Sequence, residues 1–319
     1  MNIEKVFIVE PHGFCAGVAR AVKAVEDTLE LCGAPVYVKH EIVHNKHVVE
    51  SIAKKGAITI EELHEVPEGS VVVFSAHGSP KSHYEEAARR KLHLIDATCP
   101  LVTKVHLEVL RFIKEGYQVI YIGHRGHIEG VGVLGEVPGV DIPLVETVAD
   151  VEALNLSPSE KMVYLTQTTL SIDETRETIS ALKKKYPDII APPLEDICYA
   201  TTNRQEAVKI LADAVPVVIV VGSLTSSNSN RLRETAERAG ARAYLVDDVS
   251  DLQPEWFDGI STVGITGGAS APEDRIQEIV EYFRSHGAEV ERFEVKREEM
   301  LFAEPVELMR IRRERSGTV

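Results

Sequence analysis

The sequence has no long apolar run. Its apolar stretches, such as PVVIVV at residues 216–221, are far shorter than the roughly 20 residues that a membrane-spanning helix needs. The first residues, MNIEKVFIVEP, also lack the basic region and the small-residue cleavage site of a secretory signal. We therefore expect a cytoplasmic protein with no membrane span.

Positive charge is also scarce. The chain of 319 residues carries 35 Lys and Arg against 50 Asp and Glu, which gives a formal net charge of −15. This balance argues against general binding to nucleic acid or to anionic membranes, because both need a basic surface. An anionic ligand would have to be bound by a local set of donors.

Cysteine is rare too. The four cysteines, at positions 15, 32, 99 and 198, are too few and too far apart for the disulfide framework of a small secreted protein. They are better explained as ligands, nucleophiles or core residues. Cys32 ends the helical stretch TLELC beside a glycine, and we predict it to be a buried structural thiol.

Short β-rich runs alternate with amphipathic stretches along the whole chain. VFIVE, SVVVFSA, QVIYIG and VVIVVG are typical of strands, and VHLEVLRFIKEG and RLRETAERAG are typical of helices that end at a glycine. This alternation predicts an α/β fold with parallel sheets. Apolar residues make up 44% of the chain, enough for more than one core.

Three kinds of polar loop follow the predicted strands, and they recur in the same order. The first kind holds Cys15, Cys99 or Cys198, and the second holds His44, His127 or Ser226, which come 29, 28 and 28 residues later. The third kind holds His77, Thr168 or Ser270, at 62, 69 and 72 residues after the cysteines. The regular spacing predicts three copies of one α/β unit, arranged with pseudo-symmetry around a shared centre. The alternative is that polar loops follow the strands of any α/β protein.

We place the predicted units at residues 1–97, 98–194 and 195–285, followed by a C-terminal extension at 286–319. The extension ends in a basic stretch that we expect to be frayed. One cysteine per unit cannot form a disulfide framework, and the C-x-x-C pairs of a zinc ribbon are missing. Three thiolates around one centre would suit an iron–sulfur cluster that keeps one iron free of protein sulfur.

The ordered motifs resemble those of the 4-hydroxy-3-methylbut-2-enyl diphosphate reductase family of the non-mevalonate isoprenoid pathway. The resemblance covers about residues 10–285 and rests on GFCAGV, VHNKHVV, FSAHG, DATCPLVTKVH, IGHRGHIE, TQTTLS, ICYATTNRQ, SSNSNRL and GITGGASAPE. It implies three α/β domains around a central [4Fe-4S] cluster, seen as [3Fe-4S] after exposure to oxygen. The implied reaction is the reductive dehydroxylation of an allylic diphosphate alcohol to isopentenyl and dimethylallyl diphosphates, with two electrons and two protons.

The resemblance also implies roles for individual residues. Cys15, Cys99 and Cys198 would hold the cluster, whose unique iron would bind the substrate oxygen. Glu129 would deliver a proton, with Thr168 and His127 beside it, since a carboxyl that is shielded from water and near a diphosphate keeps its proton near neutral pH. The implied diphosphate ligands are His44, His77, His127, Thr168, Ser226, Ser227, Asn228 and Ser270.

The chain departs from the family pattern at two places near these residues. His12 stands where the family commonly has arginine, which leaves open whether a fixed positive charge lies beside Cys15. Ile128 replaces a common proline, and GVGVLG follows Glu129, so we expect a more mobile loop there.

The source of the electrons lies outside the chain, because no G-x-G-x-x-G fingerprint follows a strand. The family implies a ferredoxin or flavodoxin as the donor. Two other interpretations remain open at this stage. The chain could be an iron–sulfur sensor that does no chemistry, or a thiol-dependent transferase or hydrolase with Cys15 as nucleophile.

Overall fold

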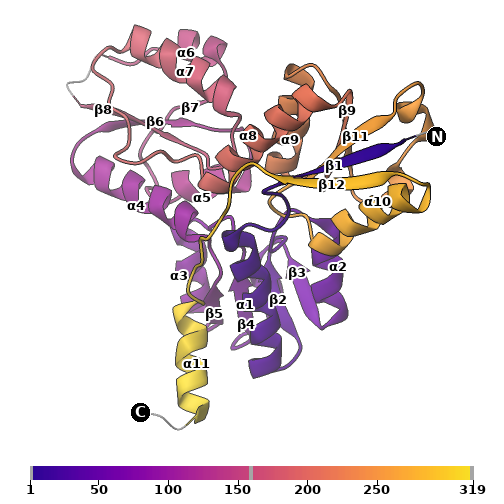
Figure 1. Cartoon of the computed structure of the whole chain (residues 1–319). Coiled ribbons are helices and arrows are strands. Elements are labelled where there is room, and N and C mark those ends of the chain that lie inside the picture. The colour runs from indigo at the N-terminus through magenta and orange to yellow at the C-terminus, as the bar shows by residue number, and fades with distance from the viewer. Residues whose placement is uncertain (1–2, 158–160, 317–319) are drawn as a thin grey trace. The chain divides into compact units, whose positions relative to one another are not determined.

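The computed structural model describes residues 3–157 and 161–316. Within them the chain forms three sheets in which all strand pairs are parallel, with helices between the strands (Figure 1). The predicted α/β class with parallel sheets is therefore confirmed. No helix among the described residues is both long enough and apolar enough to cross a bilayer.

The chain divides into two compact units. Unit 1 consists of Met1–Val18, His44–Glu50 and Tyr199–Leu301. Unit 2 consists of Ala19–Val43, Ser51–Cys198 and Phe302–Val319. The predicted unit boundaries at residues 97, 194 and 285 remain a prediction.

Unit 1 contains a five-stranded sheet in the order β10-β9-β11-β1-β12. Its strands and helices are β1 (Lys5–Glu10), β9 (Val217–Val221), β10 (Arg242–Val246), β11 (Thr262–Gly267), β12 (Glu289–Glu294), α8 (Tyr199–Ala214), α9 (Ser227–Arg238) and α10 (Glu273–Ser285). Alternate residues of β9 face opposite sides, as the strand geometry requires. Ile219 packs in the core that α10 covers, whereas Val218 and Val220 pack against α8 and α9.

The N-terminal strand and the C-terminal extension meet in this sheet. Lys5 to Glu10 pair in parallel with Glu289 to Glu294 on one side, and Lys5 to Ile8 pair with β11 on the other. The sheet edge in unit 1 thus contains part of the segment that we expected to lie outside the repeated units.

Unit 2 contains two sheets. The first has the order β3-β2-β4-β5 and is formed by β2 (Val36–Lys39), β3 (Ala57–Ile60), β4 (Val71–Phe74) and β5 (His93–Asp96). Helix α3 (Lys81–Arg89) packs on it through Ala87, which lies in one buried cluster with Val72 and Phe74. Helices α1 (Ala16–Cys32) and α2 (Lys46–Lys54) each begin in unit 1 and end in unit 2.

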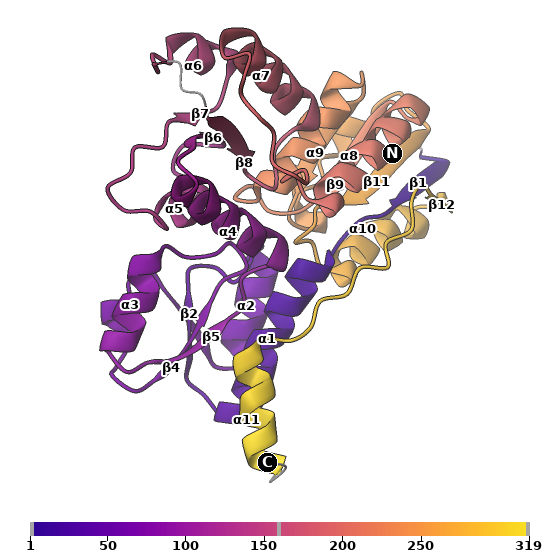
Figure 2. The same ribbon diagram turned by 90° about the vertical axis from the view of Figure 1, so that its left-hand side faces the viewer.

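The second sheet of unit 2 has the order β7-β6-β8, from β6 (Gln118–Ile122), β7 (Leu144–Val145) and β8 (Met162–Thr166). Helix α4 (Pro100–Lys114) covers one face, where Val105 and Val109 pack with Val119 of β6. Helix α7 (Ile172–Lys185) covers the other face (Figure 2). The remaining helices of this unit are α5 (Ile128–Leu134), α6 (Val148–Ala153) and α11 (Val306–Ser316).

Two local predictions are wrong. Cys32 is exposed rather than buried, because it is the last residue of α1 and the chain turns away at Gly33 with a φ of 80°. The basic C-terminal stretch forms helix α11 as far as Ser316 instead of fraying, and Leu308 of that helix is fully buried; residues 317–319 lie outside the described residues. One buried leucine gives the helix a packed face that its charged composition does not reveal.

Candidate active site

The three cysteines of interest each lie directly before a long helix. Cys15 precedes α1, Cys99 is the N-cap residue of α4, and Cys198 precedes α8. Free backbone N–H groups at a helix start favour negative charge, and Val18 N donates to Cys15 Sγ at 3.5 Å. All three cysteines are partly buried, and sulfur donors of this kind fit soft thiolate ligation.

Unit 2 brings six of the predicted site residues together, namely His77, Cys99, His127, Glu129, Thr168 and Cys198. Cys99 N donates to Ala76 O at 3.0 Å, which places the cysteine beside the His77 loop. The imidazole rings of His77 and His127 lie edge to face, with centroids 6.4 Å apart. Cys198 N donates to Thr168 O at 3.0 Å. The loops after β4, β5, β6 and β8 therefore form one continuous group, as expected where parallel strands end.

Glu129 is the most deeply buried acid of this group, with 2% of its surface exposed. Thr168 holds both oxygens of the carboxyl: its backbone N donates to Oε1 at 2.7 Å and its hydroxyl donates to Oε2 at 2.7 Å. Burial raises the pKa of Glu129 to about 7, although the two hydrogen bonds from Thr168 act in the opposite direction. The charge of Asp196 raises this pKa further.

The start of α5 explains why Glu129 is buried. His127 is the N-cap of this helix, and its Nδ1 accepts a hydrogen bond from Glu129 N at 3.2 Å. Ile128 therefore occupies the first helical position, where proline is common, so either residue is compatible with the same helix start. A Cβ at Gly130 would lie 3.2 Å from Tyr121 Cε1, so this glycine lets the helix pack closely on the buried β6. In place of the predicted loop, the residues after His127 form a packed helix.

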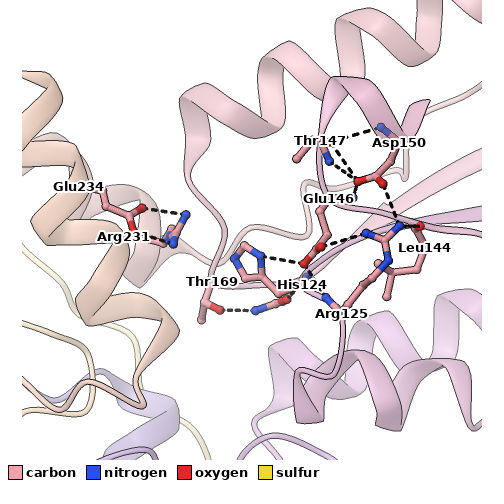
Figure 3. Close-up of polar contacts among 10 residues, drawn as sticks. His124, Arg125, Leu144, Glu146, Thr147, Asp150, Thr169, Arg231 and Glu234 are labelled. Atoms are coloured by element: carbon pink, nitrogen blue, oxygen red, sulfur yellow. Dashed lines mark hydrogen bonds and ion pairs between the residues drawn. The ribbon is translucent and has the colours of Figure 1, made fainter. Parts of the chain in front are cut away.

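The loop before α5 is held by polar contacts at the end of β6 (Figure 3). Gln167 Oε1 accepts a hydrogen bond from His124 N at 3.0 Å, and Gln167 Nε2 donates to Thr169 at 2.9 Å. Arg125 forms ion pairs with Glu146 at 3.0 Å and Asp150 at 2.9 Å. Its guanidinium holds the pKa of Asp150 well below the usual range.

Unit 1 brings a second group of predicted residues together. Cys15 N donates to Ala269 O at 3.1 Å, next to Ser270, and the hydroxyl of Ser270 donates to His44 O at 3.0 Å. Asn228 Oδ1 accepts a hydrogen bond from Ala269 N at 2.8 Å.

Ser226 is the N-cap of α9, since its hydroxyl accepts a hydrogen bond from Ser229 N at 3.2 Å, and Ser227 is the first helical residue. The hydroxyls of Ser226 and Ser270 lie 3.4 Å apart. Three polar loops, which follow β1, β9 and β11, therefore meet at one edge of the sheet.

The residue after Cys198 contacts the residue after Cys15. Ala16 N donates to the hydroxyl of Tyr199 at 3.3 Å, which joins the start of α1 to the start of α8. Burial raises the pKa of Tyr199 to about 12, so its hydroxyl stays protonated. The sequence analysis did not single out this tyrosine, although it lies inside the motif ICYATTNRQ.

Arg204 is a second functional candidate that the sequence analysis missed. Its side chain is 1% exposed, its Nη2 donates to Gly13 O at 2.8 Å, and its Nη1 pairs with Glu298 at 3.0 Å. The fixed positive charge beside the Cys15 loop is thus supplied by Arg204 of α8. His12, noted above as a departure from the family pattern, lies 3.2 Å from Glu273, and this contact lowers the pKa of Glu273. A charged residue within an otherwise buried helix was the available sequence signal.

Comparison with known proteins shows the family. A family model described as LytB protein matches residues 6–284. The 4-hydroxy-3-methylbut-2-enyl diphosphate reductase of Tolumonas auensis is 52% identical over 307 residues, which are 95% of this chain and 99% of that protein. The enzyme of the same name from Streptomyces coelicolor is 51% identical over 317 residues, 99% of this chain and 94% of the relative.

Solved structures agree with the sequence relatives. The structure of the E-1-hydroxy-2-methyl-but-2-enyl-4-diphosphate reductase from Plasmodium falciparum superimposes with a TM-score of 0.95 at 38% identity. The match covers 98% of this chain and 99% of the other.

Proposed function

Because the chain belongs to the LytB family, whose curated relatives are reductases of isoprenoid synthesis, we propose that it carries out the full dehydroxylation reaction. The substrate is (E)-4-hydroxy-3-methylbut-2-enyl diphosphate. Two electrons and two protons are consumed, the hydroxyl leaves as water, and isopentenyl and dimethylallyl diphosphates are formed. The buried Glu129, bound by Thr168 through both carboxyl oxygens, is the observation that supports this chemistry most directly.

Cys15, Cys99 and Cys198 would hold a [4Fe-4S] cluster in this proposal. The cluster would pass on electrons from an external donor and would provide a Lewis-acidic iron for the substrate oxygen. Support comes from the motif match and from the placement of each thiol before a helix, where backbone donors favour the thiolate form.

Glu129 is the proposed proton donor. Its pKa of about 7 leaves a large fraction protonated at neutral pH, and its burial excludes the solvent that would otherwise compete for the proton. Thr168 fixes the direction in which the carboxyl points, and His127 caps the helix that carries it.

The diphosphate would be bound by neutral donors from the polar loops. His44, Ser226, Ser227, Asn228 and Ser270 lie in the loops of unit 1, and His77 lies in unit 2. The start of α9 adds backbone N–H groups, which suit a phosphate. Such a site binds an anion without a large basic surface, in keeping with the net charge of −15.

The test is the Glu129→Gln variant, prepared and assayed without oxygen. We expect it to keep the iron and sulfide content of the parent while turnover falls by about 10²–10⁴-fold. A variant with normal turnover would refute the proton-donor role. A sensor without chemistry would have no need of the Glu129–Thr168 pair. A parent protein that binds the iron–sulfur cluster but shows no turnover would favour that alternative.

A further inference from the structure

A buried histidine on α4 has no part in the reaction as described above. His106 is the last residue of the motif DATCPLVTKVH, and it is 7% exposed. Its Nδ1 donates a hydrogen bond to Glu136 Oε1 at 2.7 Å, because a carboxylate can only accept. Glu136 directly follows Gly135, the C-cap residue of α5. The pair therefore joins α4 to the end of the helix that carries Glu129.

The opposite edge of the imidazole faces the loop that carries His77. A Cβ at Gly78 would lie 2.6 Å from His106 Nε2. Gly78 also has a φ of 82°, a left-handed conformation that glycine adopts without strain. The backbone next to His77 thus lies directly against the imidazole, at a distance that a larger residue would not permit.

Helix α5 contacts the same ring from a third side and lies beside α4 (Figure 2). A Cβ at Gly132 would lie 3.2 Å from His106 Cε1 and 3.4 Å from the carbonyl carbon of Gly78. A Cβ at Gly135 would overlap the side chain of Pro80. These two glycines let α5 lie directly on the loop that precedes α3, and the imidazole fills the space that remains between α4 and this junction.

The imidazole is not explained by packing alone. Among the residues that the structure describes, His106 Nε2 has no hydrogen-bond partner. A buried nitrogen that has lost water without gaining another partner costs free energy. An apolar side chain of similar size would fill the same space without this cost. The histidine differs from such a side chain because its ring is fixed at one edge by Glu136 while its other edge supports Gly78.

The two parts of the proposed site depend on this ring to different degrees. Thr168, from the loop after β8, holds Glu129 through both carboxyl oxygens. The backbone of His77, in contrast, continues directly into Gly78, which rests on the imidazole edge. The rings of His77 and His127 lie edge to face with centroids 6.4 Å apart. Their spacing therefore follows the distance that the buried imidazole sets between the loop and α5.

We propose that His106 is a positioning residue for the diphosphate end of the substrate. By separating the loop after β4 from α5, it sets the spacing of His77 and His127, two of the proposed diphosphate ligands. The inference rests on the proposed function, which assigns the diphosphate to these histidines. It concerns substrate binding and not proton transfer, because Glu129 is held independently by Thr168. A loss of the imidazole should thus act on KM more than on kcat.

Two variants change the junction in opposite directions. Asparagine places its amide nitrogen near the position of Nδ1, so His106→Asn keeps a donor for Glu136 and removes the ring edge that supports Gly78. Gly132→Ala keeps the ring and adds a methyl group that presses on it from α5, although alanine itself favours a helix.

The matched control is His83→Asn on α3 of the same unit. His83 Nδ1 is likewise buried without a hydrogen-bond partner in the described part of the chain. Its ring packs edge to face on Phe74, with centroids 6.3 Å apart. The control therefore removes a comparable imidazole from a neighbouring position in the same unit.

Each variant is prepared with its cluster and without oxygen. The first measurement is kcat and KM for the substrate, with dithionite-reduced methyl viologen as an electron source that needs no partner protein. The second is the Kd for inorganic diphosphate, measured by titration calorimetry, which requires no turnover.

We expect His106→Asn to raise the KM and the Kd for inorganic diphosphate by about tenfold or more, while kcat stays within about threefold of the parent. Gly132→Ala should raise KM by about threefold or more. In the double variant Gly132→Ala/His106→Asn, the methyl group should add less than about twofold, because the smaller side chain leaves room for it. His83→Asn should behave like the parent in both measurements.

Three results would overturn the positioning role of His106. These are an unchanged KM and Kd in His106→Asn, a fall of kcat at unchanged KM, and an equal effect in His83→Asn. Should His106→Asn fail to fold, an unchanged KM in Gly132→Ala would overturn it as well. The diphosphate titration separates this inference from the proposed function. A parent that binds inorganic diphosphate without any turnover would refute the proposed reaction, and weaker diphosphate binding by His106→Asn would still support the positioning role.

Discussion

Thr168 binds Glu129 at both ends of its carboxyl group, through the backbone N at Oε1 and through the hydroxyl at Oε2, each at 2.7 Å. Both hydrogen bonds favour the charged form of the acid, whereas burial favours the neutral form, and burial is the larger effect. The balance leaves Glu129 close to half-protonated at neutral pH. A small change in either contribution should therefore be visible in the pH dependence of the reaction.

Turnover should fall as the pH rises through about 7. The donor is active in its protonated form, and that form is lost above a pKa of about 7. The measurement is kcat against pH from 5.5 to 9, with methyl viologen as reductant. A rate that rises across this range would mean that Glu129 acts as a base.

The Thr168→Val variant should move this fall to higher pH. It removes the hydroxyl that stabilises the carboxylate but keeps the backbone N–H, so the pKa of Glu129 should increase. The same kcat profile measures the shift, and the expected direction is upward by a fraction of a pH unit to about one unit. Thr169→Val, which removes the hydroxyl that accepts from Gln167 instead, is the control and should leave the midpoint in place. A downward shift in Thr168→Val would contradict the role assigned to the hydroxyl.

Much of the fold could be predicted from the sequence because it depends on local patterns. The runs VVIVV and QVIYI became fully or largely buried parallel strands, and the polar loops after them meet at the sheet edges in each unit. The pairing of β1 with β12 could not be predicted, since Ile8 and its partner Arg292 are 284 positions apart and no local pattern records which strands become neighbours. Cys32 was misplaced because a helix end gives no sign of whether it points into a core.

A site residue could be predicted where it lies in a recognisable short motif and has a side chain that the proposed reaction requires. Glu129 and Thr168 were both named from short motifs, and the structure places them in contact. Arg204 was missed because its partners, Gly13 and Glu298, lie 191 and 94 residues away along the chain. Only the folded structure reveals that this arginine fills a buried position between them.

The cysteines provide a matched pair for testing metal ligation. Cys15 and Cys32 lie at opposite ends of α1, one before its first residue and one as its last. Cys15→Ser should lose at least most of the bound iron together with the visible absorption of the cluster, because one of three proposed ligands is removed. Cys32→Ser should keep the iron content and turnover of the parent, because its thiol is exposed at the helix end. Equal iron in both variants would contradict the assignment of Cys15.

The buried side chain of Arg204 should contribute far more to stability than the exposed ion pair between Lys5 and Glu291. It joins Gly13, before Cys15, to Glu298, after β12, and its side chain is 1% exposed. Arg204→Ala leaves a partly buried carboxylate and a backbone carbonyl without their donor, so we expect it to lower the free energy of unfolding by about 3 kcal/mol or more. The measurement is urea denaturation followed by circular dichroism.

Lys5→Ala is the control for Arg204→Ala. Lys5 on β1 pairs with Glu291 on β12 at 2.8 Å, and both side chains are exposed to solvent. An exposed ion pair contributes little to the free energy of unfolding, because water screens the two charges and solvates them equally well when they are apart. The urea midpoint of Lys5→Ala should therefore match that of the parent. An Arg204→Ala variant with the same urea midpoint as the parent would contradict the prediction. It would mean that water replaces the guanidinium without any loss of unfolding free energy.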